Sequence, residues 1–265
     1  MLLTTKDPHL HRAAAARDPL GLLPIWAEQA RDLIPSLTSL TTSARGFQLV
    51  LTIIWTYDQL ELRHPKASER GLIAWVPLVE QAFARAWSFN RGDQRRSWPL
   101  PGRLRAERRR LESSPSISQS DEDQLLNAPI ATGTFGIYRG AAGRAGLLGD
   151  GLRSLSSSAQ RAMRDAPPLS KGELDGLLTL LWPAFNQPKV LVAFDLRRQS
   201  ALANALVRVL TALPQRELLK AQILRAAPIT SALTDLLHQS TSSARTRHRA
   251  TLLALQAQNP EFSAT

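Results

Sequence analysis

The sequence predicts a mainly α-helical protein, and three observations favour that class. Apolar residues recur at three- and four-residue spacings along much of the chain. Helix-capping residues precede several of these runs, as in Ser170 followed three positions later by Glu173. Proline and glycine stand between the runs, where helices end. With 265 residues, 43% of them apolar, the chain is long enough for one large domain or two small ones.

The amino-terminal third predicts three helices. The first covers residues 22–34 and ends at Pro35. The second, over residues 44–62, is apolar almost all round, which is typical of a helix buried by its neighbours; the run is too long for a strand. A third helix follows over residues 68–87, and Pro77 is expected to kink or divide it.

The composition changes between residues 90 and 120. A short basic helix is predicted over residues 103–112, and the Ser/Pro-rich residues 113–120 are typical of a linker. We therefore expect an amino-terminal helical domain over residues 1–112, ending in a basic segment, and a second helical domain over residues 121–265. This basic segment, residues 91–110, carries eight arginines against one aspartate and one glutamate: Arg91, Arg95, Arg96, Arg103, Arg105, Arg108, Arg109 and Arg110.

Seven glycines fall between residues 132 and 167. The pattern predicts a helix over residues 137–148, a tight turn, a brief strand over residues 152–155 and a helix capped by Ser156. This order is that of a small winged helix at residues 132–165. A phosphate loop is not expected, because the G-x-x-x-x-G-K-[ST] pattern is absent.

The remaining chain predicts a carboxy-terminal helical bundle. A helix begins after Ser170, and further helices are expected over residues 197–213, 215–226, 230–239 and 243–258. The run 190–194 has the composition of a strand, and Asp195 follows it, so a catalytic carboxylate at that strand end is kept as a minor alternative.

Charge supplies the functional prediction. The chain carries 33 Lys and Arg against 22 Asp and Glu, a net charge of +11, which favours polyanions or acidic proteins as partners. Clustered guanidinium groups bind phosphates and release counterions. We expect nucleic acid, DNA or RNA, to bind the eight arginines of the basic segment, and Arg139 and Arg144 on the helix and Arg153 on the wing to reach phosphates as well.

Two other interpretations of the basic segment remain open. Trp87, Phe89 and Trp98 interleave with the arginines and would stack on unpaired bases if exposed, but they would equally serve as core residues. The arginines themselves would also suit an acidic protein partner or a merely solvated surface.

Several site classes are not expected. The absence of cysteine excludes disulfides, thiolate zinc sites, iron–sulfur ligation and a cysteine nucleophile. Five scattered histidines do not favour a structural zinc site, and G-x-S-x-G is absent. We assign no catalytic, cofactor-binding or metal-ligating residue and predict a non-enzymatic protein. No secretory signal or membrane span is recognised, so a cytoplasmic location without a membrane partner is expected.

Two stretches resemble a group of uncharacterised bacterial helical proteins encoded near antiphage defence genes. The first runs from Leu20-Gly21 through an L-I-P-S-L-T turn at residues 33–38 to T-T-S-A-R at residues 41–45, before an apolar helix; Ser36 stands where the group tends to have glycine. The second is the glycine-led helix at residues 133–148 with the leucines that follow it.

The resemblance implies a non-catalytic subunit that acts beside a helicase, nuclease or other ATP-driven protein. Together with the charge pattern, it leads to the hypothesis of a nucleic-acid-binding accessory subunit of a prokaryotic antiviral defence complex. The alternative is a structural adaptor that docks protein partners without touching nucleic acid.

Overall fold

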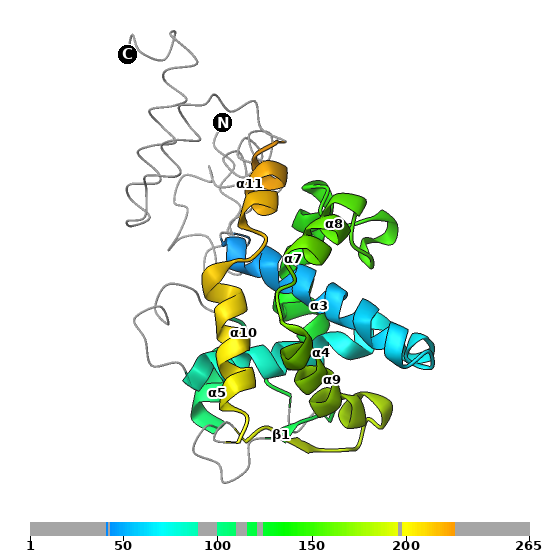
Figure 1. Ribbon diagram of the computed structural model, residues 1–265. Coiled ribbons are helices and arrows are strands. Elements are labelled where there is room, and N and C mark those ends of the chain that lie inside the picture. Colours follow the sequence, from blue (N-terminus) through cyan, green and yellow to red (C-terminus); the bar gives the residue numbers. More distant parts are fainter. Residues whose placement is uncertain are drawn as a thin grey trace, which may run out of the picture.

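The computed structural model describes residues 41, 43–89, 100–109, 116–120, 124–195 and 198–225, and it confirms a mainly helical fold (Figure 1). Helices predicted over residues 22–34, 230–239 and 243–258 lie outside these ranges. The described elements run in the order α3 (Ala44–Arg63), α4 (Ala67–Phe89), α5 (Arg103–Arg109), β1 (Ser116–Ile117), α6 (Pro129–Thr132), α7 (Thr134–Arg144), η2 (Asp150–Leu152), α8 (Ser157–Asp165), α9 (Lys171–Asn186), β2 (Val192–Ala193), α10 (Ser200–Ala212) and α11 (Arg216–Arg225).

Helix α3 lies at the centre of the described fold, as its apolar sequence predicts. It contacts α4, α7 and α10 directly, and α8, α9 and α11 also touch it. Every residue from Gly46 to Tyr57 is buried. Ser43 caps the helix by accepting a hydrogen bond from the N–H of Arg45 (3.3 Å). Burial on all sides explains why no polar face interrupts this segment.

Helix α4 is broken at Gly71, not at Pro77. The backbone at Gly71 has φ +73°, the one non-helical conformation within α4. Glycine adopts this conformation without a Cβ clash, so the break falls there. Pro77 removes one backbone hydrogen bond but keeps a helical φ, and the chain continues through it as a helix. The expectation that Pro77 divides the helix is therefore wrong.

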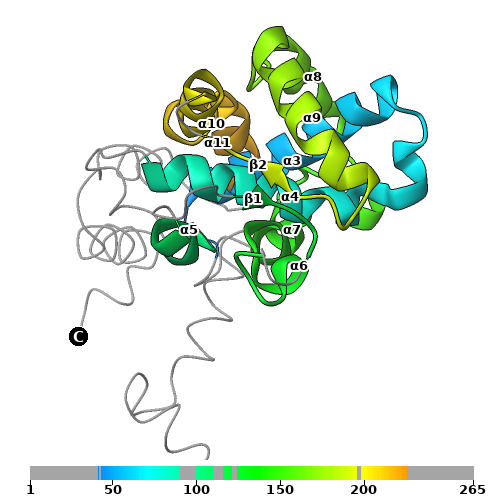
Figure 2. The same cartoon turned by 90° about the horizontal axis from the view of Figure 1, so that it is seen from below.

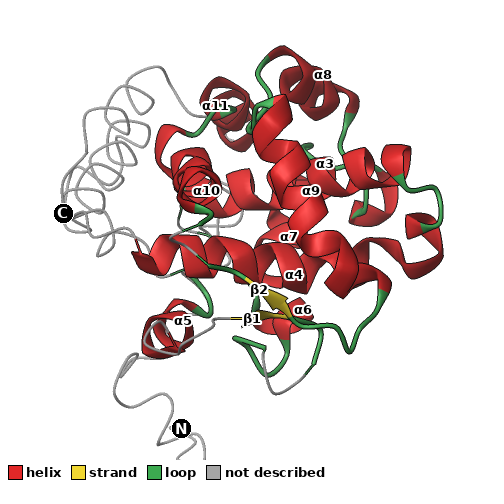
Figure 3. Ribbon diagram, turned by 60° about the horizontal axis from the view of Figure 1, so that its bottom comes forward, coloured by secondary structure: helices red, strands yellow, loops and turns green. Residues whose placement is uncertain are grey.

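The prediction that residues 113–120 form a linker is wrong for residues 116–120, the part that the structure describes. Ser116–Ile117 forms strand β1, which pairs antiparallel with β2, Ser116 opposite Ala193 and Ile117 opposite Val192 (Figure 3). The Ile117 side chain is fully buried. Helix α4 satisfies the neighbouring carbonyls, because Gln81 donates to the Ser118 oxygen (2.7 Å) and Arg85 donates to the Ser116 oxygen. Residues from both sides of the expected boundary share one hydrophobic core.

The glycine-rich region forms α6, α7, η2 and α8. Helix α7 begins at Thr134 and ends at Arg144, earlier at both ends than predicted. The strand expected over residues 152–155 is wrong: a 3-10 turn and one isolated bridge, Leu148 to Leu155, take its place. Ser156 caps α8 as predicted, accepting from the N–H of Ala159 (3.4 Å). Two helices thus flank a loop closed by a single bridge, and the winged helix at residues 132–165 stays a prediction.

Close approach explains several glycines. A Cβ atom at Gly46 of α3 would overlap the ring of Tyr138 on α7, and one at Gly143 of α7 would overlap the side chain of Leu152. The Tyr138 ring packs edge-on against Phe47 with centroids 5.2 Å apart. These glycines bring α7 close to α3 and the 147–156 loop close to α7.

The last described helices close the bundle. Ser170 and Glu173 form the predicted capping box of α9. Gln215, in the turn between α10 and α11, connects three elements: its N–H donates to Gln48 of α3 (3.2 Å), its Oε1 accepts from the same side chain, and its Nε2 donates to the Ala166 carbonyl after α8 (2.5 Å).

Candidate nucleic-acid interface

Half of the predicted basic segment is described. Arg103, Arg105, Arg108 and Arg109 belong to α5, whereas Arg91, Arg95, Arg96 and Arg110 lie outside the described residues. Ala106 is buried and α5 packs on α4. This packing turns Leu104, Arg105 and Arg108 toward solvent.

Most of the charge on α5 is not neutralised by acids of α5 itself. Arg103 pairs with Glu107 one turn later (3.7 Å). Arg105 donates to the Gln124 carbonyl (3.0 Å) and to the side-chain oxygen of Asn127 (3.3 Å), both uncharged acceptors, so it keeps its full positive charge. Arg108 is exposed, and no carboxylate of the described residues pairs with it.

A second group of arginines surrounds α7, the 147–156 loop and α8. The Arg139 guanidinium lies over the Phe135 ring (5.6 Å to the centroid) and is half-buried. Arg144 and Arg153 are exposed. On α8, Ala159 and Met163 face the core, which leaves Arg161 and Arg164 in solvent. Among the described acids, none pairs with the exposed arginines at 153, 161 and 164.

Sequence reasoning did not assign Arg161 and Arg164 to the site. The spacing of their inward-facing neighbours gives the signal that would have found them. Ala159 and Met163 are four residues apart and mark the buried stripe, so positions 161 and 164 fall on the opposite side of α8.

The structure does not bring the two groups of arginines together. Figure 1 places α5 at the lower left and α8 at the upper right, and the turned view in Figure 2 separates them in the same way. The loop of the second group packs on α7 through Leu152 and Gly143, so its arginines lie at one end of the fold. The candidate interface therefore consists of two separate basic surfaces. We call them the α5 surface (Arg105, Arg108) and the α7–α8 surface (Arg139, Arg144, Arg153, Arg161, Arg164).

The aromatic residues do not extend the α5 surface where they are described. Trp87 is 1% exposed, and the Arg45 guanidinium lies 5.8 Å from its ring centre. Trp87 is therefore a core residue, which is the second of the two interpretations left open by the sequence. Trp98 and the side chain of Phe89 lie outside the described residues.

Among the described residues, no metal-ligating cluster forms around Asp195, the minor alternative for a catalytic carboxylate. Asp195 pairs with Arg198 (3.4 Å) just after β2, and both side chains are accessible to solvent. Within the described ranges, no three His, Asp or Glu side chains gather in a way that would hold a metal ion. Of the described helices, none has the length and apolar composition needed to cross a bilayer.

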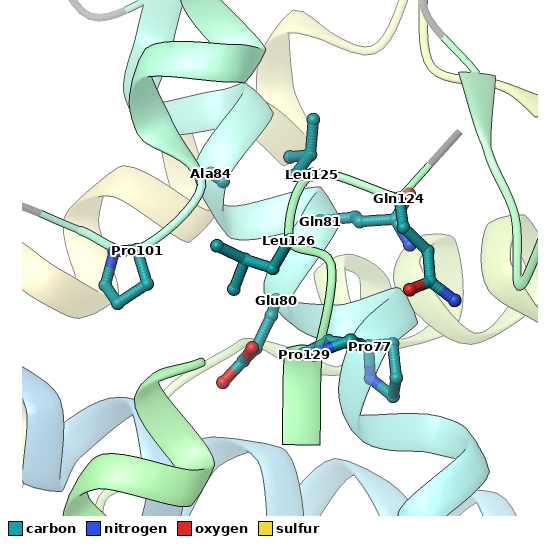
Figure 4. Close-up of a pocket in the computed structure, with 9 residues that line it drawn as sticks. All are labelled: Pro77, Glu80, Gln81, Ala84, Pro101, Gln124, Leu125, Leu126 and Pro129. Carbon is teal, nitrogen blue, oxygen red and sulfur yellow. The ribbon is translucent and has the colours of Figure 1, made fainter. Parts of the chain in front are cut away.

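A buried acid on α4 was not found from the sequence. Glu80 lines a small pocket between α4, Pro101 and residues 124–129 (Figure 4). It stands between Val79 and Gln81 in the buried second half of α4, and only the fold reveals that its neighbours are the backbone N–H groups of α7. Burial raises its pKa to about 8, although those N–H groups act in the opposite direction.

The described residues thus offer two exposed arginine surfaces and one buried carboxyl. The arginines suit recognition of anions, because each guanidinium presents several N–H donors in a planar fork. The carboxyl is closed off from large ligands by the residues around it. No family model, curated protein or solved structure matches this chain.

Proposed function

We propose that this chain is a nucleic-acid-binding, non-catalytic accessory subunit. One observation carries the proposal: Arg105 and Arg108 project from α5, a helix that packs on α4, and are not paired with described carboxylates. Arginines that are not paired with a carboxylate are available to an external anion, and phosphate groups of a nucleic acid match the guanidinium fork. The resemblance of the amino-terminal and glycine-rich stretches extends the proposal to a prokaryotic antiviral defence complex.

The two surfaces favour contact with the phosphate backbone over reading of bases. Backbone contacts position a protein on nucleic acid without reading its sequence. Arg105 supports this mode because two of its N–H groups already hold Gln124 and Asn127, which fixes the side chain on the surface of the fold. We therefore expect binding that depends strongly on salt and weakly on sequence.

Salt dependence tests the proposal. The logarithm of the binding constant should fall with the logarithm of salt concentration, with a slope of about −0.9 per phosphate contacted on duplex DNA and about −0.7 on a single strand. Replacing Arg108 by Ala should reduce the slope by about one such contact, and adding Arg153→Ala should reduce it further. Fluorescence anisotropy with labelled duplex, single-stranded DNA and RNA measures these slopes.

Two paired arginines provide matched controls. Arg208 pairs with Glu173 (2.6 Å) and Arg63 pairs with Asp175, so each already has an acid of its own chain. Arg208→Ala and Arg63→Ala remove the same formal charge but should leave the slope unchanged. The proposal fails if the full chain shows no salt-dependent binding to any of the three nucleic acids, or if the control variants weaken binding as much as Arg108→Ala.

A structural adaptor is the second candidate, and Leu104 favours it. This side chain is 62% exposed on α5, next to Arg105 and about one turn before Arg108. An exposed leucine beside arginines suits a protein interface, where apolar contacts and Arg are both common. Co-purification from cells after nuclease treatment separates the candidates: an adaptor retains its protein partner and loses it on Leu104→Asp, whereas a nucleic-acid-dependent complex dissociates.

A further inference from the structure

Glu80 places a carboxyl group at the start of helix α7. The residue is 7% exposed, and its Oε1 accepts a hydrogen bond from the N–H of Phe135 (2.6 Å). The N–H of Thr134 also interacts with the carboxyl group. Figure 4 shows the carboxyl beside Pro129 and directed away from Gln124. Oε1 of Glu80 thus accepts a hydrogen bond from the first turn of α7.

The other oxygen, Oε2, has no hydrogen-bond donor. A Cβ atom at Gly133 would overlap both Glu80 Oε2 and the carbonyl oxygen of Pro129, so these two oxygens border the same small space. Two buried oxygen atoms without a hydrogen between them repel each other, and a buried acceptor without a donor is costly. A proton on Oε2 removes both problems, because it converts that oxygen into a donor facing a carbonyl.

Among the described residues, no charged side chain acts on the ionisation of Glu80. Helix α6 and residues 124–128 contain no ionisable side chain. On α7, Arg139 lies over Phe135; on α5, Arg103 pairs with Glu107; on α4 itself, Arg85 donates to the Ser116 carbonyl. The other ionisable side chains of α5 and α7 are Arg105, Arg108, Arg109, Tyr138 and Arg144, and those of α3 are Arg45, Tyr57, Asp58, Glu61 and Arg63. The ionisation of Glu80 responds only to burial and to backbone N–H groups.

We infer that Glu80 is held as a neutral carboxylic acid whose proton joins α4 to the α6–α7 junction, and that loss of this proton loosens the junction. The acid then acts as a pH-sensitive latch: Oε1 accepts from the start of α7 while the protonated Oε2 donates toward Pro129 at the start of α6. Burial supports the inference because it raises the pKa of Glu80 to about 8, despite the two N–H groups that favour the charged form.

The direction of the pH effect follows from linkage. In the unfolded chain Glu80 titrates near its ordinary pKa of 4.5, and in the folded chain near 8. Between these values the folded state holds one proton more than the unfolded state. The contribution of Glu80 to the free energy of unfolding is therefore fully present below about pH 4.5 and falls as pH rises toward about 8. The unfolding equilibrium constant should rise by up to about tenfold per pH unit in this window.

Glu80→Gln tests the inference, because glutamine imitates the neutral acid: its oxygen accepts from Phe135 and its amide donates toward Pro129. Denaturant unfolding at a series of pH values from about 5 to about 9 measures the free energy of unfolding. For Glu80→Gln this free energy should depend less on pH than for the wild type, by the uptake of one proton. Glu80→Gln should also be more stable than the wild type at pH 8 to 9. Glu80→Ala, which cannot donate or accept, should be less stable than Glu80→Gln at every pH. Glu69→Gln provides the control, because Glu69 is exposed on the same helix; it should keep the wild-type profile.

An infrared spectrum supplies a second measurement that does not depend on stability. The carbonyl stretch of a neutral carboxylic acid should be present in the folded wild type at pH 7 and absent from Glu80→Gln. The inference is overturned if that band is missing at pH 7, if Glu80→Gln keeps the wild-type pH profile, or if Glu80→Gln is as unstable as Glu80→Ala at pH 6.

Discussion

The contact between Gly46 of α3 and Tyr138 of α7 predicts that adding a single methyl group there destabilises the fold. A Cβ atom at Gly46 would overlap the Tyr138 ring, which is 3% exposed and cannot move outward freely. The ring also packs edge-on against Phe47, and its hydroxyl accepts from the N–H of Ser43 (3.3 Å). Gly46→Ala must therefore displace a ring that is fixed at both ends.

The magnitude follows from two opposing effects. Alanine is favoured over glycine in a helix by about 1 kcal/mol. Overpacking a buried site costs about 1–3 kcal/mol, and a ring held by two contacts places Gly46 in the upper part of that range. The net effect of Gly46→Ala is then a loss of about 1–2 kcal/mol in the free energy of unfolding.

Gly176 provides the matched control for this prediction. It lies within α9, and a Cβ atom there would meet nothing within 4 Å, so Gly176→Ala should stabilise the chain by about 0.5–1 kcal/mol. At about 2–4 °C per kcal/mol, the two variants should differ in Tm by roughly 5–10 °C in thermal unfolding followed by circular dichroism. Equal Tm values for Gly46→Ala and Gly176→Ala would refute the close packing of α3 against α7.

Two further predictions concern a helix cap and a half-buried acid. Ser170→Ala removes the side-chain oxygen that accepts from the N–H of Glu173 (3.4 Å), and should cost about 1 kcal/mol in chemical unfolding; Ser170→Thr should restore most of it, and equal stability of all three chains would contradict the cap. Burial, and then the charge of Glu61, raises the pKa of Asp58 to about 6, so the wild type should lose stability as pH rises from about 4 to about 6, and Asp58→Asn should lose the part of that dependence that Asp58 contributes and keep the part from Glu80. An NMR titration that finds the Asp58 midpoint near its ordinary value of 3.8 would show that this prediction is wrong.

The sequence predicts the helices best where the signal is local. Ser170 and Glu173 define the start of α9 because both partners of the capping box lie within one turn. Burial of α3 on all sides is visible in its unbroken apolar composition. The break at Gly71 is not visible, since an isolated glycine in a helix pattern has several outcomes and only the packing of the chain selects a left-handed φ.

Non-local pairing accounts for the main errors. Residues 116–120 have the Ser-rich composition of a linker, and the partner strand at residues 192–193 is far away in the sequence. Two-residue strands carry no alternating pattern that would identify them. The glycines of α7 gave a similar difficulty, because Gly143 is required by the approach of Leu152, not by a turn or a wing.

The candidate site, like the fold, could be predicted from the sequence only in part. The concentration of arginine on α5 is a property of composition and needs no structure to be seen. The partners of those side chains are not: Arg105 meets Gln124 and Asn127 only because the chain returns beside α5 after β1. The hydrogen-bond donors that surround Glu80 lie more than fifty positions further along the chain, so no local sequence pattern predicts its environment.

Gln215 sets a lower limit on how short a working version of this polypeptide can be made. Its amide and backbone satisfy the otherwise enclosed Gln48 and the Ala166 carbonyl. An expression fragment that stops ahead of Gln215 would leave the buried side chain of Gln48 without its hydrogen bonds to Gln215, even though every residue of α3 is retained. Fragments intended for binding assays or crystallisation should therefore extend beyond that turn.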